Sequence, residues 1–383
     1  MKHKTLLTFG LLFYFGLSIA QSNERPVDSS FPNNIINIGG RIHYQMSFFC
    51  ESDSLKNQLG ASQNGTQLRR LYLNLKGKLD KNIKYKFQFG FLNGKIGIRD
   101  IHISFLDLPF FDELKVGRFK EPISLEATTS SNHITFIERS MNTDFSLKRN
   151  NGFQVNKFFL DKSILWVFGF FQNSTKFGKS TFKNNNFTSK LTYLPVFKEN
   201  GKYLVHLGLA YSYRNPINSI MTFEAKPEDN LANPYLSKTI NDVDKMHLAN
   251  LELIVQKNAF SLQSEYLHYT PVDKFGDKYF EAFYMEVSYF LTKEHRNYVK
   301  KLRNFKEIHP IHNYNRALRQ YGALQVAFRI SRFDLDQSIL KNYTLAVNWF
   351  LNPNTRISGS FGIANVDTLG ISKIGQMKFQ VTF

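Results

Sequence analysis

The 383-residue sequence has little of several residue types that mark common protein classes. It contains one cysteine, Cys50, which excludes an internal disulfide framework and any site built from several cysteine ligands. Proline is scarce, with 11 residues, and helical periodicity is nearly absent. After the first 20 residues, no apolar run is long enough to cross a bilayer as a helix. The rest of the chain is therefore either soluble or crosses a membrane with strands.

The start of the chain indicates export. Lys2 and Lys4 precede an uncharged apolar run, residues 5–19, and small residues stand at Ser18 and Ala20. This pattern predicts a signal peptide over residues 1–20, cleaved after Ala20. An N-terminal membrane anchor is the weaker alternative, because the apolar run is short for a spanning helix.

Aromatic residues and strand-length alternation are what the sequence has in quantity. Aromatic residues make up 15% of the chain, with 38 Phe and 18 Tyr. Residues 70–78, 83–91 and 323–333 alternate apolar and polar side chains, and so does the terminal stretch 377–383. A strand places successive side chains on opposite faces, so each segment has one apolar and one polar face. Many such strands with aromatic belts favour an outer-membrane barrel, with the apolar face toward lipid and the polar face toward the lumen.

The connections differ in length. Short turns contrast with three long polar stretches, residues 120–150, 214–244 and 293–318. Outer-membrane barrels have short periplasmic turns at one end and long outer loops at the other, so we expect the three long stretches at the outer end. The sequence predicts an all-β protein, a transmembrane antiparallel β-barrel over residues 38–383, preceded by a flexible segment, residues 21–37.

The formal net charge of +18 points to anionic partners. Export excludes nucleic acid and leaves small anions and anionic surfaces. The basic stretch within residues 293–307 suits either an electrostatic funnel for anions or a face toward lipopolysaccharide. No cofactor is expected. His309 and His312 lie in a proline-containing loop, which is weak support for a metal site.

Residues 114–140 carry a resemblance to a known family. The segments Gly117–Pro122, Ser124–Glu126, Thr129–Ser131 and Glu138–Arg139 resemble the hallmark block of the phosphate-selective porin O and P family. The resemblance extends over about residues 38–383, and the variant is similar to those of Bacteroidetes-type bacteria.

This resemblance implies a barrel of about 16 strands, usually a homotrimer, with an inward-folded constriction loop and an anion site of Arg and Lys side chains. It also implies outer-membrane lipid and lipopolysaccharide as surroundings. The C-terminal Phe383 resembles the residue that the barrel assembly machinery recognises in the last strand. The predicted localisation is the cell outer membrane, and the predicted function is a passive diffusion channel for small anions, including phosphate or polyphosphate.

Nine residues are candidates for binding anions and lining the pore. Most of the candidates among residues 69–100 are selected because the alternation places them on the lumen face. Arg69 lies on the opposite face and is included with Arg70 because the family has a matching Arg-Arg pair. The hallmark block supplies the last three. Each candidate could instead be a solvated surface charge or part of a lumen salt bridge. The candidates are Arg69, Arg70, Lys76, Lys84, Lys86, Asp100, Arg118, Lys120 and Arg139.

Two features leave alternatives open. Lysine outnumbers arginine on the lumen parity, and acids such as Glu252 and Glu286 share it, which predicts weak rather than strict anion selectivity. A lipid-hydrolysing barrel enzyme is a second hypothesis; it needs a Ser–His pair on the lipid-facing parity. A third is a closed structural or adhesive barrel, which would insert normally and conduct negligibly.

Overall fold

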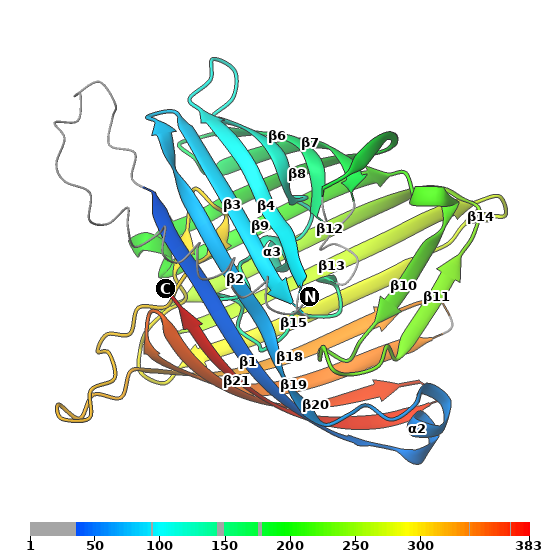
Figure 1. Ribbon diagram of the computed structural model, residues 1–383. Coiled ribbons are helices and arrows are strands. Elements are labelled where there is room, and N and C mark those ends of the chain that lie inside the picture. Colours follow the sequence, from blue (N-terminus) through cyan, green and yellow to red (C-terminus); the bar gives the residue numbers. More distant parts are fainter. Residues whose placement is uncertain (1–35, 93–94, 144–148, 175–177, 337, 368) are drawn as a thin grey trace, which may run out of the picture. The chain divides into compact units, whose positions relative to one another are not determined.

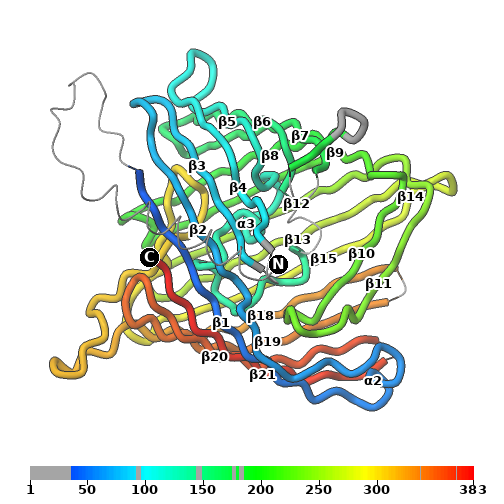
Figure 2. Tube along the Cα trace, in the orientation of Figure 1, coloured from blue at the N-terminus to red at the C-terminus, as the bar shows by residue number. Residues whose placement is uncertain are grey.

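Sixteen long antiparallel strands close into a barrel in the computed structural model of the protein (Figures 1 and 2). The structure describes residues 36–383 except 93–94, 144–148, 175–177, 337 and 368, and these described residues form one unit. The predicted signal peptide, residues 1–20, and residues 21–35 of the predicted flexible segment lie outside the described residues. Within the described ranges, no helix has the length and apolarity needed to cross a bilayer.

The barrel strands follow one another around the sheet, each antiparallel to its neighbours. They are β1 (Asn37–Glu51), β2 (Gly65–Asp80), β3 (Ile83–Leu92), β4 (Lys95–Leu106), β5 (Glu113–Lys120), β6 (Arg149–Phe159), β7 (Ile164–Ser174), β8 (Ser180–Lys198), β9 (Tyr203–Arg214), β12 (Val243–Lys257), β13 (Phe260–Asp273), β15 (Phe280–Phe290), β18 (Ala323–Asp334), β19 (Ile339–Asn352), β20 (Thr355–Val366) and β21 (Gly370–Thr382). The shorter elements lie in the connections. They are α2 (Asp53–Leu59), α3 (Leu125–Thr128), η2 (Glu199–Gly201), η3 (Ile217–Ser219), β10 (Met221–Ala225), β11 (Leu236–Ile240), β14 (Gly276–Asp277), β16 (Tyr298–Val299) and β17 (Asn304–Phe305).

The barrel strands are apolar on the outside and polar on the inside, as the alternation predicts. On β21, Met377, Phe379 and Val381 are 42%, 39% and 44% exposed, whereas Lys378 and Gln380 are 0% and 6% exposed. In a membrane barrel, the exposed apolar side chains face lipid, and the polar side chains of the other parity face the lumen. The periodicity of this strand therefore places its side chains correctly.

The first and last strands close the barrel. β1 and β21 pair from Arg41↔Thr382 to Glu51↔Ser372, so neither keeps a free edge. Beyond the ladder, Gly40 N–H donates to the carbonyl of Phe383 (2.7 Å), and Phe383 N–H donates back (3.2 Å). The ring of Phe383 packs on Gly40, where a Cβ atom would collide with it. The aromatic C-terminus thus covers the glycine of β1 and leaves a 64% exposed ring toward lipid.

The two ends of the barrel differ. An even number of strands brings the start of β1, Asn37, and the end of β21, Thr382, to one end of the barrel, together with the short turns at residues 81–82, 160–163, 258–259 and 353–354. We call this the short-turn end, and in barrels of this kind it faces the periplasm.

One of the three long stretches is not where its length predicts. The described residues 121–143 and residues 215–242 lie at the opposite end, the long-loop end, but residues 291–322, between β15 and β18, lie at the short-turn end. The expectation of three outer loops is therefore wrong for residues 293–318. The end at which a loop emerges is set by the direction of the strand before it, and loop length carries no information on that direction. The basic stretch 293–307 consequently lies away from the lipopolysaccharide side.

Three segments fold into the lumen. They are the constriction loop (described residues 121–143), the hairpin segment (residues 215–242, with β10 and β11) and the first half of the insertion (residues 291–322), where Tyr298 and Phe305 are buried against Leu125. Phe223 of β10 packs on Phe280 of β15 with ring centroids 4.8 Å apart. Tyr269 and Phe333 belong to the same apolar core. The apolar core therefore lies inside the barrel, on the β12–β19 side.

Candidate channel constriction

The constriction loop leaves the wall at the end of β5, within the hallmark block. Glu121 is fully buried and accepts hydrogen bonds from Arg214 Nη2 (2.9 Å), Asn150 Nδ2 (2.6 Å) and Asn186 Nδ2 (3.1 Å). Pro122 follows, and because it has no N–H it does not continue the ladder. A single buried carboxylate thus ties the start of the loop to β6, β8 and β9.

The next turn of the loop is the short helix α3, whose N-terminus meets the opposite wall. The carboxylate of Glu265 on β13 accepts the backbone N–H groups of Leu125 (3.0 Å) and Glu126 (2.7 Å). The hydroxyl of Ser124 caps the N–H of Ala127 (3.1 Å). Free N–H groups at a helix start prefer such acceptors and a negative charge, so β13 holds the loop across the lumen.

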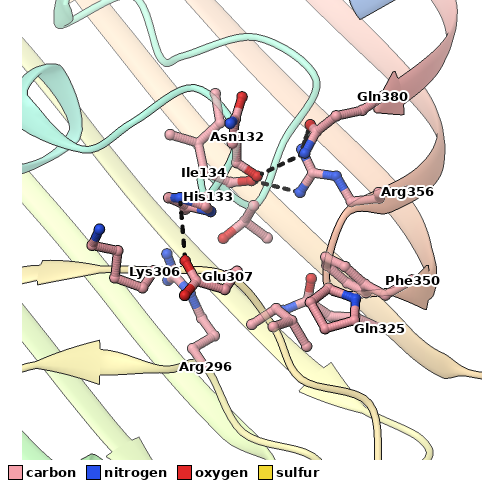
Figure 3. Close-up of a pocket in the computed structure, with 13 residues that line it drawn as sticks. Asn132, His133, Ile134, Arg296, Lys306, Glu307, Gln325, Phe350, Arg356 and Gln380 are labelled. Carbon is pink, nitrogen blue, oxygen red and sulfur yellow. Dashed lines mark hydrogen bonds and ion pairs between the residues drawn. The ribbon is translucent and has the colours of Figure 1, made fainter. Parts of the chain in front are cut away.

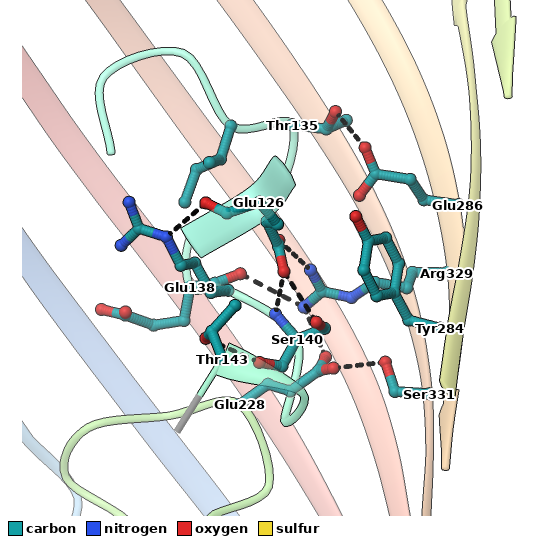
Figure 4. Close-up of polar contacts among 12 residues, drawn as sticks. Glu126, Thr135, Glu138, Ser140, Thr143, Glu228, Tyr284, Glu286, Arg329 and Ser331 are labelled. Carbon is teal, nitrogen blue, oxygen red and sulfur yellow. Dashed lines mark hydrogen bonds and ion pairs between the residues drawn. The ribbon is translucent and has the colours of Figure 1, made fainter. Parts of the chain in front are cut away.

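A buried charge network fixes the middle of the loop (Figure 4). Arg329 on β18, 1% exposed, pairs with Glu126 of the loop (3.4 Å) and with Glu228 of the hairpin segment. The second carboxylate oxygen of Glu126 accepts the N–H (3.0 Å) and hydroxyl (2.6 Å) of Ser140. Burial raises the pKa of Glu126 to about 8, against the opposing effect of Arg329. One guanidinium therefore joins two inward segments to the wall.

The far side of the loop ends on β2. Glu138 accepts hydrogen bonds from Arg69 Nε (2.6 Å) and from Arg70 Nη2 (2.8 Å). Two consecutive strand residues normally point to opposite faces, but the register of β1 and β2 shifts between His43 and Tyr44, leaving Arg69 in a β-bulge. The bulge turns both arginines into the lumen. Burial opposes ionisation, yet the two arginines lower the pKa of Glu138 to about 2.

Next to this pair, two guanidinium groups flank one aromatic ring. Arg41 and Arg99 lie over the ring of Tyr72, at 4.9 and 5.1 Å from its centroid. Arg99 has the parity of its lipid-facing neighbours, but the β3–β4 ladder shifts between Phe87 and Phe89, so a second bulge turns it inward. Gly90 on β3 leaves the space, since a Cβ there would contact Arg99 Nε at 3.0 Å.

An acid links the neighbouring basic residues. Asp100 accepts from Lys86 Nζ through one oxygen and from Arg149 Nε through the other, both at 2.6 Å. Asp100 therefore orients a lysine of β3 and an arginine of β6.

The C-terminal end of β5 and the N-terminal end of β6 bring further basic groups close to Asp100. The β4–β5 ladder ends at Ile101↔Arg118, whereas the β5–β6 ladder continues to Lys120↔Arg149. Lys120 Nζ donates to the carbonyl of Ala127 in α3. Lys120 therefore contacts the constriction loop and lies within electrostatic range of Asp100.

Arg139 is held within the constriction loop. Its Nε donates to the carbonyl of Glu126 (2.9 Å) and its Nη2 to that of Thr129 (2.6 Å). The side chain remains partly exposed and lies within electrostatic range of Arg70 and Arg149.

Six of the nine candidates therefore lie around one space, Arg118 lies at its edge, and Lys76 and Lys84 are exposed. Arg118 shares the outward parity of Val116 and donates to Ser174 Oγ, but it is 9% exposed and lies within electrostatic range of Arg99, Asp100 and Arg149. Lys84 lies on lumen parity nearer the short-turn end, and Lys76 lies opposite Lys86 in the β2–β3 ladder. The six that come together are Arg69, Arg70, Lys86, Asp100, Lys120 and Arg139.

Sequence reasoning missed three arginines of this group. Arg41 follows the alternation of residues 41–48, a pattern that supports it as clearly as Arg70. Arg99 has no such signal, because simple alternation assigns it to lipid, and Arg149 stands at the first position of its strand. We call the whole group the basic wall; it comprises Arg41, Arg69, Arg70, Lys86, Arg99, Lys120, Arg139 and Arg149, with Asp100 and Glu138. Eight positive and two negative charges leave the basic wall at +6.

On the other side of the constriction loop, the insertion closes part of the lumen. Arg296 lies 3.5 Å from the ring centroid of Phe305 and pairs with Glu286 of β15 (3.3 Å). A pocket separates the insertion from the loop tip, where Arg356 donates to the carbonyl of Ile134 (2.8 Å) (Figure 3). The insertion therefore lies beside the loop tip, on the short-turn side of the lumen.

Comparison with known proteins agrees with this architecture. Residues 36–366 match the family model described as phosphate-selective porin O and P. Porin O of Pseudomonas aeruginosa is 23% identical over 385 residues, which cover 87% of this chain and 83% of that protein.

Solved structures show the same fold at low identity. The anion-selective porin from Comamonas acidovorans has a TM-score of 0.55 and 12% identity, covering 92% of this chain and all (100%) of that chain. A loop L8 deletion mutant of OmpT, an outer membrane protein of Vibrio cholerae, has a TM-score of 0.57 and 10% identity with 92% and 100% coverage. With a family model that spans nearly the whole described barrel, the chain belongs to the phosphate-selective porin O and P family and is an outer-membrane porin, a channel rather than an enzyme.

Proposed function

We propose that this porin passes small anions along the basic wall and favours phosphate-sized oxyanions over chloride. The observation that carries the proposal is the +6 charge of a wall whose opposite side is a tightly anchored, mostly neutralised loop. The family's description and the name of the Comamonas porin point in the same direction. Rings of basic side chains are the expected filter of an anion pore.

The chemistry of the basic wall suits an oxyanion in transit. A guanidinium presents a planar fork of donors that matches two oxygens of a phosphate, and a lysine adds a compact charge. Arg41 and Arg99 contact the ring of Tyr72, and the hydrogen bonds of Arg41 Nη1 go to the neutral hydroxyls of Ser130 (3.2 Å) and Ser131 (2.9 Å) rather than to a carboxylate. Asp100 and Glu138 offset part of the charge, so an anion is held weakly enough to leave.

The proposal includes the setting of the channel. We place it in a homotrimer in the outer membrane of a Bacteroidetes-type bacterium, after removal of residues 1–20 and with a flexible lead that ends before Asn37, the first residue of β1. Assembly there depends on recognition of the last strand, ending at Phe383. Lipid and lipopolysaccharide surround it.

Reversal potentials across planar bilayers test the proposal. The wild type should be anion-selective, and phosphate should reduce the chloride current by competing for the basic wall. A unit charge roughly 8 Å from a permeating ion contributes about 0.5 kcal/mol in water, with opposite sign for anion and cation. Arg99→Gln should therefore lower the anion-to-cation permeability ratio by about five-fold.

Lys274→Gln is the matched control, because this 61% exposed lysine lies on the turn between β13 and β15, away from the basic wall. It removes the same charge and should leave the ratio unchanged. Cation selectivity of the wild type, or equal effects of the two substitutions, would contradict the proposal. Normal insertion with negligible conductance would instead support a closed barrel.

A further inference from the structure

The second half of the insertion forms a projecting segment, residues 311–321, at the short-turn end (Figure 1). Its side chains contribute little to the lumen. Ile311, Leu318 and Tyr321 are 60%, 65% and 69% exposed, although all three are large and apolar. Apolar side chains gathered on one exposed segment indicate a contact surface rather than random exposure.

The projecting segment lies against the lipid-facing side of β19. Trp349 has the same parity as Leu345 and Val347, which are 57% and 44% exposed, so its ring is part of the outer surface. Trp349 Nε1 donates to the carbonyl of Tyr321 (2.6 Å). The ring of Tyr314 meets Trp349 edge-on, with centroids 5.6 Å apart.

Backbone contacts hold the segment in that place. Tyr314 N–H donates to the carbonyl of Leu351 (2.7 Å), and Asn315 and Gln320 exchange hydrogen bonds that close a tight loop. Gly322, with φ of +73°, then returns the chain to the wall, where a Cβ would strike the carbonyl of Phe350. The outer aromatic belt of the barrel therefore continues into the projecting segment.

The charges of the segment have one sign. Arg316 and Arg319 are exposed beside Leu318 at the tip, and the sequence has no Asp or Glu from residue 308 to residue 333. Exposed apolar side chains flanked by arginine, next to an interfacial Trp–Tyr pair, match the headgroup boundary of an anionic bilayer.

We propose that residues 311–321 bind anionic phospholipid in the periplasmic leaflet. Leu318 and Tyr321 enter the boundary of the acyl chains, and Arg316 and Arg319 contact headgroup phosphates. Lipid is the occupant because the segment continues the lipid-facing belt through Trp349 and because its charge complements anionic headgroups. The site is separate from the lumen, so its occupancy does not depend on which ion the channel passes.

Fluorescence quenching by brominated lipid tests the proposal on the intact barrel. The chain has two tryptophans, and Trp166→Phe leaves Trp349 as the only indole. This parent is reconstituted in phosphatidylcholine vesicles containing the same mole fraction of either brominated phosphatidylglycerol or brominated phosphatidylcholine. Phosphatidylglycerol should be enriched at Trp349, by about five-fold for each arginine.

Arg316→Gln with Arg319→Gln should abolish that enrichment. The control removes two exposed lysines from the same end of the barrel, Lys198→Gln with Lys257→Gln, and should retain it. Unchanged conductance shows that each variant is folded.

Equal quenching by the two lipids in the parent would overturn the proposal, as would enrichment that survives the arginine substitutions. A second copy of the chain is the other occupant to test. Chemical cross-linking of the parent is compared with that of Leu318→Asp. Loss of a native oligomer in Leu318→Asp, with no lipid enrichment in the parent, would assign the segment to a second copy of the chain instead.

Discussion

Glu138→Gln separates the anchoring role of the constriction loop from the charge of the basic wall. Glu138 is 7% exposed and binds Arg69 and Arg70. Its pKa falls from 4.5 to about 2, so the folded carboxylate gains about 3 kcal/mol over the unfolded one. A carboxyl group with a lowered folded pKa stabilises the protein above about pH 4.5, and that contribution is lost as the pH falls toward 2.

The variant should therefore be less stable than the wild type at neutral pH, and the difference should vanish in acid. Heating the purified barrel in detergent and following the loss of the folded gel band at both pH values measures this. Glu138→Gln also removes a negative charge from the basic wall, so its anion selectivity should rise while its stability falls.

Glu307→Gln is the control, because that carboxylate is 41% exposed and meets only His133 and His309 at 3.8 Å among the ion pairs of the described residues. It should change neither property. Wild-type stability of Glu138→Gln at neutral pH, or an unaltered loss of stability in acid, would refute the reasoning about the loop anchor.

Three further outcomes follow from the same contacts. Burial raises the pKa of Glu126 from 4.5 to about 8, so the stability contributed by its protonated form is full below pH 4.5, falls as the pH rises and is lost by about pH 8; the wild type should lose melting stability over this range, and Glu126→Gln should lose less. Arg329→Met leaves Glu228 buried without its cation and should cost about 3–5 kcal/mol in the same gel assay, with larger and noisier channel currents. Gly40→Val places a side chain against the ring of Phe383 and should impair membrane insertion, measured by heat-modifiable gel mobility after expression, whereas Gly359→Val, with open space around it, should insert normally.

Alternation predicts the barrel because it is a local property. Each strand must present one face to lipid and one to water, so residues 377–383 carry the same information alone as they do in the folded sheet. The end at which residues 291–322 emerge is different in kind. It depends on how many strands precede them, and that count comes from the whole chain rather than from the loop's own composition.

The site is predicted only where the strands are regular. Arg70 and Lys86 follow the lumen parity, and Arg69, which the family pair suggested and parity alone assigns to lipid, turns to Glu138 of the loop; their role in binding anions stays a prediction. Arg99 was missed because a bulge reverses its face, and a bulge is decided by two strands together. Arg118 shows the converse, since the hallmark block includes it but its ladder gives it outward parity, and its guanidinium binds Ser174 at the edge of the group.

The basic partners of the lumen acids determine how strongly these acids affect ion selectivity. Glu252 and Glu286 share the lumen parity, and counting them as free charges predicts a weak anion preference. Glu252 is neutralised by Lys190 at 2.6 Å and is within 3.2 Å of His206, and Glu286 pairs with Arg296. Both are at most 4% exposed, beneath the loop and the insertion. On the proposed path, a permeating ion meets the basic wall, where positive groups exceed carboxylates, while Glu252 and Glu286 are held in ion pairs.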